Sequence, residues 1–551
     1  MIIDEPSWET IAAESVLLKA VSNWRDNSEK WLEHSVERLN ETVRVNPARE
    51  DMMWVEDWLQ KNGGTKIEWF SGAGSAWNLP FPRGKAEGEV KTILSALHET
   101  GRLTRQEAVS MIPVVALDVK PGEIVLDLCA SPGSKTTQIA EHLRGKGIVL
   151  ANEISSSRIN TLVANVKRHG SITPMITHHD GRFLPNVPKS GFDKILVDAP
   201  CTGSATTRKN PDVWKKWLPS GGKTLHKLQL ELLTKAIKLA KPGGRIVYST
   251  CSLDPIENEA VISEILRLDK GISLTSLSDI MTKLPGRRGM TEWPQLDELG
   301  RISNISSSIS SMLSPNENRI KDELKKCHRI WNDDIKAGGF FVAVLEKSVQ
   351  YGEENVEYDR FIEPEKIKPD ELNFPRPLGY ENEDMVQERL GLEGKNLWIR
   401  GKSILWSTTQ ARDIWESDRS KRGGRTFIPG KRWRPLRVIH LGLICARLQN
   451  GKIERISSKA APKLTRNIKH GKSSVKSEVI DTLLGGAEPP AYEINLELNK
   501  IRGGHILVEE NGGICLPVWI GGRVSLMISE QERRILRAKR KLPIIIELEE
   551  E

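Results

Sequence analysis

The chain has 551 residues and a formal net charge of +8, from 81 basic and 73 acidic side chains. This length exceeds what one hydrophobic core usually supports, so two or three domains are expected. The six cysteines have no zinc-like spacing, which argues against a metal site and for free thiols in a reducing compartment. Because no apolar run is long enough to span a bilayer and no signal-like segment opens the chain, we expect a soluble, intracellular protein.

The first 110 residues are predicted to form an N-terminal helical flank. Apolar side chains recur at helical spacing through residues 8–43, and the pattern ends near Asn46-Pro47. We interpret this stretch as an accessory segment placed before the main domain, which we assign to residues 111–347.

From about residue 111, predicted strands and amphipathic helices alternate. The strands are expected at 123–128, 148–152, 175–179, 194–198, 244–250 and 339–346, and the helices at 135–144, 156–169, 222–241 and 255–268. Such alternation indicates an α/β fold with a mostly parallel, doubly wound, Rossmann-like sheet. Ligands of such sheets bind beyond the carboxyl ends of the strands, where Asp127, Glu153, Asp180 and Asp198 fall.

Two of these acids suit a nucleoside ligand. Glu153 would accept hydrogen bonds from ribose hydroxyls, and Asp180 would accept one from an adenine amino group. The alternative is that strand-end acids cap the next helix or fix a turn. The loop after the first strand lacks the glycine and lysine spacing of a phosphate-binding loop. Only Gly133 and the small side chains of Ala130 and Ser131 leave space for a ligand. A nucleoside cofactor with few phosphates therefore fits this loop.

Two cysteines follow predicted strands, Cys201 in Asp198-Ala199-Pro200-Cys201 and Cys251 in Ser249-Thr250-Cys251. Asp254-Pro255-Ile256-Glu257 reads as a helix start, so we expect a helix just after Cys251, with its positive end favouring the thiolate. The alternative is that both thiols are buried and inert, as lone cysteines often are. Their shared position in polar turns at strand ends favours thiol chemistry beside a nucleotide-like cofactor.

Three motifs carry a resemblance to the Sun (RsmB/NOP) family of RNA cytosine-5 methyltransferases, over roughly residues 40–347. They are Leu126-Asp127-Leu128-Cys129-Ala130-Ser131-Pro132-Gly133-Ser134-Lys135, Val197-Asp198-Ala199-Pro200-Cys201 and Tyr248-Ser249-Thr250-Cys251-Ser252-Leu253. The chain departs from the tRNA-modifying branch at Ser204-Ala205, where Asp-Gly is usual, and at Glu153, where Asp is usual.

The resemblance implies S-adenosylmethionine as cofactor, held by Cys129 to Lys135, Glu153, Asp180 and Asp198. It also implies that Cys251 adds to carbon 6 of cytosine and that Cys201 assists release of the product. Asp198 would support protonation of nitrogen 3 if burial raises its proton affinity. The thiol roles come from the family likeness and not from spacing, because DNA cytosine methyltransferases use the Pro-Cys thiol as nucleophile.

Residues 348–395 are rich in Glu, Asp and Pro and are predicted to be a linker. Residues 396–551 contain short strands with Gly-rich turns, which indicate a small mixed or β domain. By resemblance this would be a PUA-like RNA-binding domain. The runs Lys421-Arg422-Gly423-Gly424-Arg425-Thr426-Phe427 and Lys431-Arg432-Trp433-Arg434 mix cations with aromatic rings, as RNA contacts or a solvated charged loop would.

The expected activity is methylation of cytosine in tRNA. An rRNA substrate, or a role as a non-catalytic RNA-binding assembly factor, is the alternative. Further RNA contacts are expected from the N-terminal flank and from side chains near Cys201. These side chains are Arg208, Lys209, Asn210, Trp214, Lys215 and Lys216. No membrane and no obligate protein partner are inferred, and the expected location is the cytoplasm, or the nucleus of a eukaryotic cell.

Overall fold

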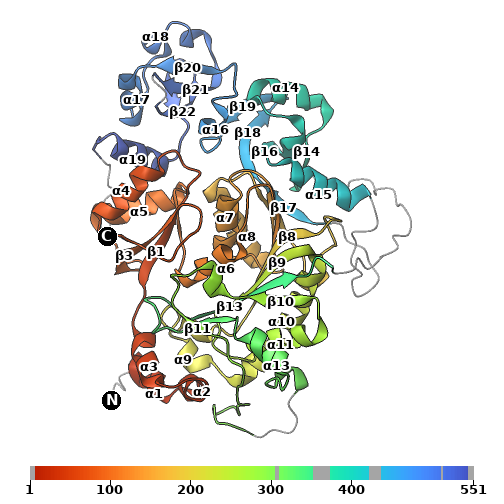
Figure 1. Cartoon of the computed structure of the whole chain (residues 1–551). Helices are drawn as coiled ribbons and strands as arrows, with labels where there is room; N and C mark the ends of the chain where they lie inside the picture. Colours follow the sequence, from red (N-terminus) through yellow and green to blue (C-terminus); the bar gives the residue numbers. More distant parts are fainter. Residues whose placement is uncertain (1–6, 304–308, 351–372, 421–435, 511–512, 544–551) are drawn as a thin grey trace, which may run out of the picture.

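The computed structural model describes residues 7–303, 309–350, 373–420, 436–510 and 513–543. A central sheet lies between the N-terminal part and the C-terminal part of the chain (Figure 1). None of the described helices has both the length and the apolar character that a membrane span needs.

The core of the central sheet is five parallel strands, β5 (Ile124–Asp127), β6 (Ile148–Asn152), β7 (Pro174–Thr177), β8 (Phe192–Asp198) and β9 (Ala240–Thr250). Their order is β9-β8-β5-β6-β7, and β13 (Phe340–Lys347) pairs antiparallel with β9. This confirms the doubly wound α/β fold that the sequence predicts.

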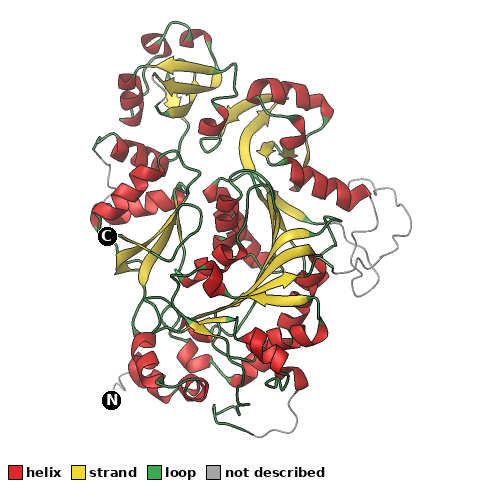
Figure 2. Cartoon of the chain, viewed as in Figure 1, coloured by secondary structure: helices red, strands yellow, loops and turns green. Residues whose placement is uncertain are grey.

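Helices cover both faces of this sheet, because side chains alternate along each strand (Figure 2). On one face, α6 (Ile112–Leu117) and α7 (Ser134–His142) share a core with Val125, Val149, Leu196 and Val247. On the other face, α10 (Pro219–Leu239) and α11 (Glu259–Leu268) share a core with Leu126, Ile195, Val197 and Ile246. The loops that follow β5, β6, β8 and β9 begin together at the carboxyl edge of the sheet, because these strands are parallel neighbours.

The N-terminal flank is not wholly helical, contrary to the prediction. Helices α1 (Trp8–Glu14), α2 (Val16–Trp24) and α3 (Ser28–Val36) end before residue 40. A four-stranded sheet follows, with α4 (Met52–Lys61) and α5 (Gly88–Glu99) and the order β2 (Thr65–Lys66), β3 (Ser75–Pro82), β1 (Asn40–Val45), β4 (Leu103–Arg105). The run Thr42-Val43-Arg44-Val45 is rich in β-branched residues, which favour a strand over the helix expected through residue 43.

The C-terminal part contains two further sheets. One has the order β14 (Arg376–Pro377), β15 (Leu397–Arg400), β16 (Ser403–Trp406), β18 (Leu443–Gln449), β19 (Lys452–Ile456). The other has the order β20 (Lys472–Val475), β21 (Gly503–Glu509), β22 (Cys515–Ile520), β23 (Val524–Leu526). The fold is mixed α and β, and the PUA-like identity of this part stays a prediction.

Two elements tie the C-terminal part to the rest of the chain. Strand β17 (Val438–Leu441) pairs antiparallel with β7 and so extends the central sheet. Helix α19 (Glu530–Lys539) packs against α5. The predicted linker also contains α14 (Tyr380–Leu390), which contributes Val386 and Leu390 to a core of the C-terminal part. Both basic runs, 421–427 and 431–434, lie outside the described residues.

Candidate active site

The two strand-end thiols meet at the carboxyl edge of the central sheet. Strands β8 and β9 are parallel neighbours, and their register pairs Asp198 with Ser249. Each chain then turns after the strand, and the Cys201 and Cys251 sulfur atoms lie 3.2 Å apart. The structure therefore brings together the two cysteines that the sequence singled out.

The two sulfurs share one hydrogen bond in partly buried surroundings. This contact with Cys251, together with burial, raises the pKa of Cys201 well above its usual range. Cys201 therefore keeps its proton, and either sulfur can donate the hydrogen bond that the two share.

Asp198, at the end of β8, has both carboxylate oxygens engaged. Oδ2 accepts from Lys135 Nζ at 2.7 Å, and Oδ1 accepts from Ser249 Oγ at 2.8 Å. Burial by itself lowers the pKa of Lys135, but the carboxylates of Asp198 and Asp127 outweigh it, so this pKa is raised. A protonated lysine thus stands beside Asp198, and the role of Asp198 in protonating nitrogen 3 stays a prediction.

The loop that contains Cys129, Ala130, Ser131 and Pro132 joins β5 to α7, which starts at Ser134. Gly133 has φ +105°, and a Cβ at this position would lie 2.8 Å from Leu162 Cδ1. Only glycine fits both restrictions. The Ser131 carbonyl accepts from Arg158 Nη2 at 2.8 Å, which holds this loop against α8 (Ser156–His169).

Buried polar groups surround this loop. Thr136 Oγ1 donates to Asp127 Oδ2 at 2.7 Å, while Asp127 Oδ1 has no hydrogen-bond partner among the described residues. Burial raises the pKa of Asp127 to about 7 and also raises that of Cys129. An orphaned buried oxygen is a feature of a site that receives a ligand.

The other two strand-end acids differ in their surroundings. Glu153 follows β6 and is buried, with Oε1 accepting from the Ser155 amide at 2.8 Å and Oε2 lying 3.8 Å from Arg158 Nη1. Asp180 is less buried, and both its oxygens accept from Arg182. Asp180 thus has the geometry of a turn-fixing residue, which the sequence offered as the alternative, and its contact with adenine stays a prediction.

The helix after Cys251 starts later than predicted. Residues 255–258 form a turn, and α11 begins at Glu259. The reason is that polar side chains of this turn point inward: Asn258 Oδ1 accepts from Thr250 Oγ1 at 2.6 Å, and Glu257 accepts from residues of both thiol loops. The helix start is therefore four residues further along the chain, which removes the basis for the predicted dipole effect on Cys251.

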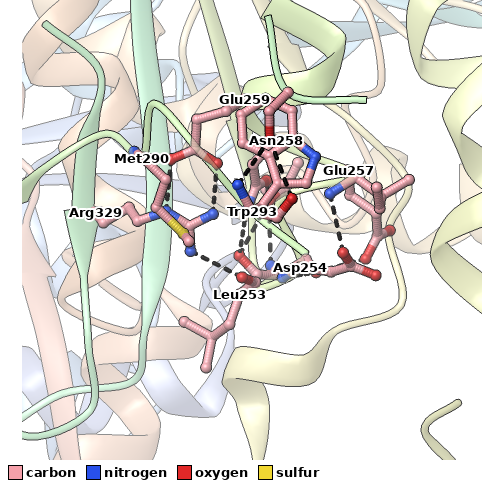
Figure 3. A network of polar contacts seen from close by, with 12 residues as sticks. Leu253, Asp254, Glu257, Asn258, Glu259, Met290, Trp293 and Arg329 are labelled. Carbon is pink, nitrogen blue, oxygen red and sulfur yellow. Dashed lines mark hydrogen bonds and ion pairs between the residues drawn. The ribbon is translucent and has the colours of Figure 1, made fainter. Parts of the chain in front are cut away.

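The ion pair between Arg329 and Glu259 was not predicted from the sequence, and it lies next to the turn that follows Cys251. Arg329, on β12 (His328–Ile330), pairs with Glu259 and donates to the Leu253 carbonyl at 2.8 Å, so it fixes the turn that follows Cys251 (Figure 3). Both side chains of the pair are almost fully buried. Glu259 and Arg329 are 70 positions apart in the chain, so the sequence gives no sign that they pair.

The predicted RNA contacts divide into exposed and buried residues. Trp214 is 3% exposed and packs against Trp31 with ring centroids 5.5 Å apart, so as an RNA contact it is a wrong prediction. Arg208 donates to the carbonyls of Glu37 and Ala337 and serves to dock the N-terminal helices. The remaining four residues are exposed: Lys209, Asn210, Lys215 and Lys216.

Comparisons with known proteins bear on the family of this chain. A family model described as 16S rRNA methyltransferase RsmB/F matches residues 114–346. The multisite-specific tRNA:(cytosine-C(5))-methyltransferase of Saccharomyces cerevisiae is 40% identical over 297 residues, 49% of this chain and 43% of that protein. The ribosomal RNA small subunit methyltransferase F of Escherichia coli O139:H28 is 46% identical over 169 residues, 30% of this chain and 35% of that protein.

A shorter relative is matched almost throughout. The tRNA (cytosine(49)-C(5))-methyltransferase of Pyrococcus abyssi is 32% identical over 330 residues, 58% of this chain and 93% of that protein. A solved methyltransferase homolog from Pyrococcus horikoshii has a TM-score of 0.45 and 30% identity, over 60% of this chain and 93% of that one. The chain spans under half the length of the first three curated relatives. On the strength of the nearly complete match to the Pyrococcus abyssi protein and of the family model, this chain belongs to the RsmB/F family of S-adenosylmethionine-dependent methyltransferases.

Proposed function

We propose that the protein methylates carbon 5 of cytosine in tRNA, with Cys251 as the nucleophile and Cys201 assisting product release. The observation that carries the proposal is the pair of sulfurs 3.2 Å apart, beside the Lys135–Asp198 pair at the ends of neighbouring strands. Two thiols at one site match a reaction that has both a covalent attack and a separate release step.

The residues at the strand ends fit a nucleoside cofactor. Gly133 lets the loop pack closely against Leu162, Glu153 would hold the ribose hydroxyls, and Asp127 has an oxygen without a partner among the described residues. When bound, S-adenosylmethionine supplies an electrophilic methyl group. The chain's own contribution is to hold the cofactor beyond β5 and β6 and the cytosine beyond β8 and β9.

Attack on the cytosine ring falls to Cys251. Carbon 5 is a poor nucleophile in the intact ring, and addition of a thiolate at carbon 6 makes it electron-rich. Nitrogen 3 needs a proton as the adduct forms. The Lys135–Asp198 pair would supply it: the Lys135 ammonium would give one proton to nitrogen 3 by way of the Asp198 carboxylate, and Lys135 would become neutral until that proton returns on release.

Release of the product reverses the addition. After the carbon 5 proton leaves, the Cys251 sulfur must depart as a thiolate. Cys201 holds its proton 3.2 Å from that sulfur, so it would donate a hydrogen bond to the departing thiolate and stabilise it. The neutral state of Cys201 supports this division of roles.

The RNA class is proposed from the relatives. The Saccharomyces cerevisiae and Pyrococcus abyssi proteins are named as tRNA methyltransferases, while the Escherichia coli relative, named as an rRNA methyltransferase, matches a shorter segment at higher identity. An rRNA substrate is therefore the second candidate. A non-catalytic assembly factor is disfavoured because both thiols are present and adjacent.

Transfer of labelled methyl groups from S-adenosylmethionine to unmodified tRNA and to unmodified rRNA tests the proposal. We expect 5-methylcytosine in tRNA with the natural chain and none with Cys251→Ser. Labelling of rRNA alone would reassign the substrate. Labelling of neither, by a folded protein that binds S-adenosylmethionine, would contradict the enzymatic proposal.

A further inference from the structure

A buried carboxylate lies between the two thiol loops. Glu257 is fully buried in the turn that precedes α11. It contacts Thr202, which follows Cys201, and Ser252, which follows Cys251. One side chain thus holds the residue next to each sulfur.

Four donors converge on this carboxylate. Oε1 accepts from the Thr202 amide at 2.8 Å and from Gln229 Nε2 at 3.1 Å. Oε2 accepts from Thr202 Oγ1 and from Ser252 Oγ, each at 2.5 Å. Burial raises the pKa of Glu257, and the donors oppose that rise. Such a set of donors is complementary to a carboxylate, which accepts at both oxygens and donates at neither.

Both hydroxyls have further contacts besides Glu257. Ser252 Oγ accepts from the Asp254 amide at 3.1 Å and lies 3.0 Å from Ser204 Oγ, whose own oxygen accepts from the Leu253 amide. Thr202 Oγ1 accepts from Trp217 Nε1 at 3.1 Å and lies 3.4 Å from Ser252 Oγ. Because these oxygens already accept from N–H groups, their protons are available to point at Glu257. An uncharged amide at this position would face two donors with an NH₂ group and leave their protons unpaired.

We propose that Glu257 is a positioning residue that sets the distance between the Cys201 and Cys251 sulfurs. It touches neither sulfur, and it acts by fixing the residue that follows each cysteine. Gln229 links Glu257 to the residue before Cys201, because its amide also donates to the Pro200 carbonyl at 2.9 Å. The inference rests on the proposed function for its catalytic meaning, since the sulfur distance decides whether Cys201 reaches the departing thiolate.

A thiol exchange equilibrium tests the positioning without RNA or cofactor. Two protein thiols and one glutathione disulfide give one protein disulfide and two glutathione molecules, and the equilibrium constant is the effective concentration of the thiol pair. We expect this value to fall by about tenfold or more in Glu257→Ala, and by less in Glu257→Gln, which retains the Oε1 contacts. The variant Cys201→Ser cannot form the Cys201–Cys251 disulfide, so the difference between it and the natural chain identifies this disulfide among those that the six cysteines can form.

Glu141→Gln is the matched control. Glu141, on α7, is likewise a fully buried carboxylate with several donors, but they are Arg44 and His169, away from the thiol loops. We expect its thiol equilibrium to match that of the natural chain. If Glu257→Ala does not fold, Thr202→Val takes its place, because it removes one donor and keeps the side-chain shape.

Kinetics on tRNA supply the second measurement. Glu257→Gln should lower kcat and increase the amount of covalent protein–RNA adduct, while the KM for S-adenosylmethionine stays unchanged. An unaltered thiol equilibrium in folded Glu257→Ala would overturn the inference. A shifted equilibrium in a protein whose natural form methylates no RNA would support the positioning role and contradict only the proposed function.

Discussion

At the scale of single residues, the site depends on a few side chains with unequal roles. Cys201 and Cys251 are equivalent in chemical type and nearly in contact, and the shared hydrogen bond together with burial raises the pKa of Cys201. The roles proposed for the two thiols are a donor, Cys201, and a nucleophile, Cys251. Substitutions that remove one sulfur at a time therefore have opposite consequences.

The first prediction separates these roles. Cys251→Ala should give neither methylated RNA nor a covalent complex, because the attacking atom is gone. Cys201→Ala should accumulate a protein–RNA adduct that survives denaturing electrophoresis when RNA and S-adenosylmethionine are both present, because release is slowed. Cys515→Ala, at a half-buried thiol in the C-terminal part, is the control. Adduct in Cys251→Ala and none in Cys201→Ala would reverse the assignment.

The second prediction concerns the proposed cofactor contact of Glu153. Glu153→Ala should weaken binding of S-adenosylmethionine by about 1–3 kcal/mol, the range for a hydrogen bond to a charged group. Titration calorimetry measures it. Asp193→Asn, at the opposite end of β8 and bonded to Lys241 and the Ile124 amide, should bind as the natural chain does. Unchanged affinity in folded Glu153→Ala would remove this residue from the cofactor site.

The third prediction concerns pH. Burial raises the pKa of Asp127 to about 7 from 3.8, so the folded state holds a proton that the unfolded state has lost between about pH 4 and 7. Stability should therefore fall as pH rises through this window, by at most about 4 kcal/mol. Asp127→Asn imitates the neutral acid and should lose this part of the pH dependence. Parallel curves of unfolding midpoint against pH for the two proteins would contradict the assignment.

At the scale of elements, strand register and loop shape decide what the residues can do. Asp198 and Ser249 are paired across β8 and β9, so the turns that follow these strands start side by side. The loop between β5 and α7 reaches its shape through Gly133, whose backbone conformation and close neighbour Leu162 both exclude a side chain. The site is thus built from loops whose starting points the sheet fixes.

The fourth prediction tests this loop. Gly133→Ala combines an unfavourable φ with a Cβ only 2.8 Å from Leu162 Cδ1, whereas Gly122→Ala has a similar φ, +98°, and open space around its Cβ. The alanine at 133 should cost about 1–3 kcal/mol of stability beyond the cost at 122. It should also weaken cofactor binding. Chemical unfolding and calorimetry of both variants measure the two effects, and equal losses would show that Leu162 moves aside freely.

At the scale of the whole molecule, the C-terminal part is joined to both other parts. Strand β17 lengthens the central sheet at β7, and α19 brings Glu532 to Arg102 of the N-terminal part. Arg102 is 5% exposed and also pairs with Asp51. A chain cut near residue 347 would therefore lose a strand of the central sheet as well as any RNA contacts of the C-terminal part.

The fifth prediction tests this junction. Glu532→Gln leaves the buried Arg102 with one carboxylate partner in place of two and should cost about 1–3 kcal/mol. Amide hydrogen exchange should become faster in α19 and in β1 to β4. Glu530→Gln changes a more exposed carboxylate on the same helix, paired with Arg533, and should leave exchange almost unchanged. Equal exchange in both variants would mean that apolar packing alone holds the junction.

The sequence by itself determined the α/β alternation, the thiol motifs, the loop with Gly133 at the end of the first strand and the family. These features are local: strand and helix periodicity, turn residues and motif spacing all act over a few residues. Its errors also have a physical cause. The strand at Thr42–Val45 is stabilised by pairing with β3 and β4, and the turn at residues 255–258 by contacts with Thr202 and Thr250, none of which adjacent residues reveal.

Only the tertiary structure decided which polar groups meet. The two sulfurs that lie 3.2 Å apart belong to residues 50 positions apart in the chain, and the Lys135–Asp198 pair spans 63 positions. The four donors on Glu257 come from residues 5 to 55 positions away. It also decided that Trp214 is core and that β17 belongs to the central sheet. Motifs record which side chains a site uses, whereas distance, burial and protonation depend on how separate segments pack together.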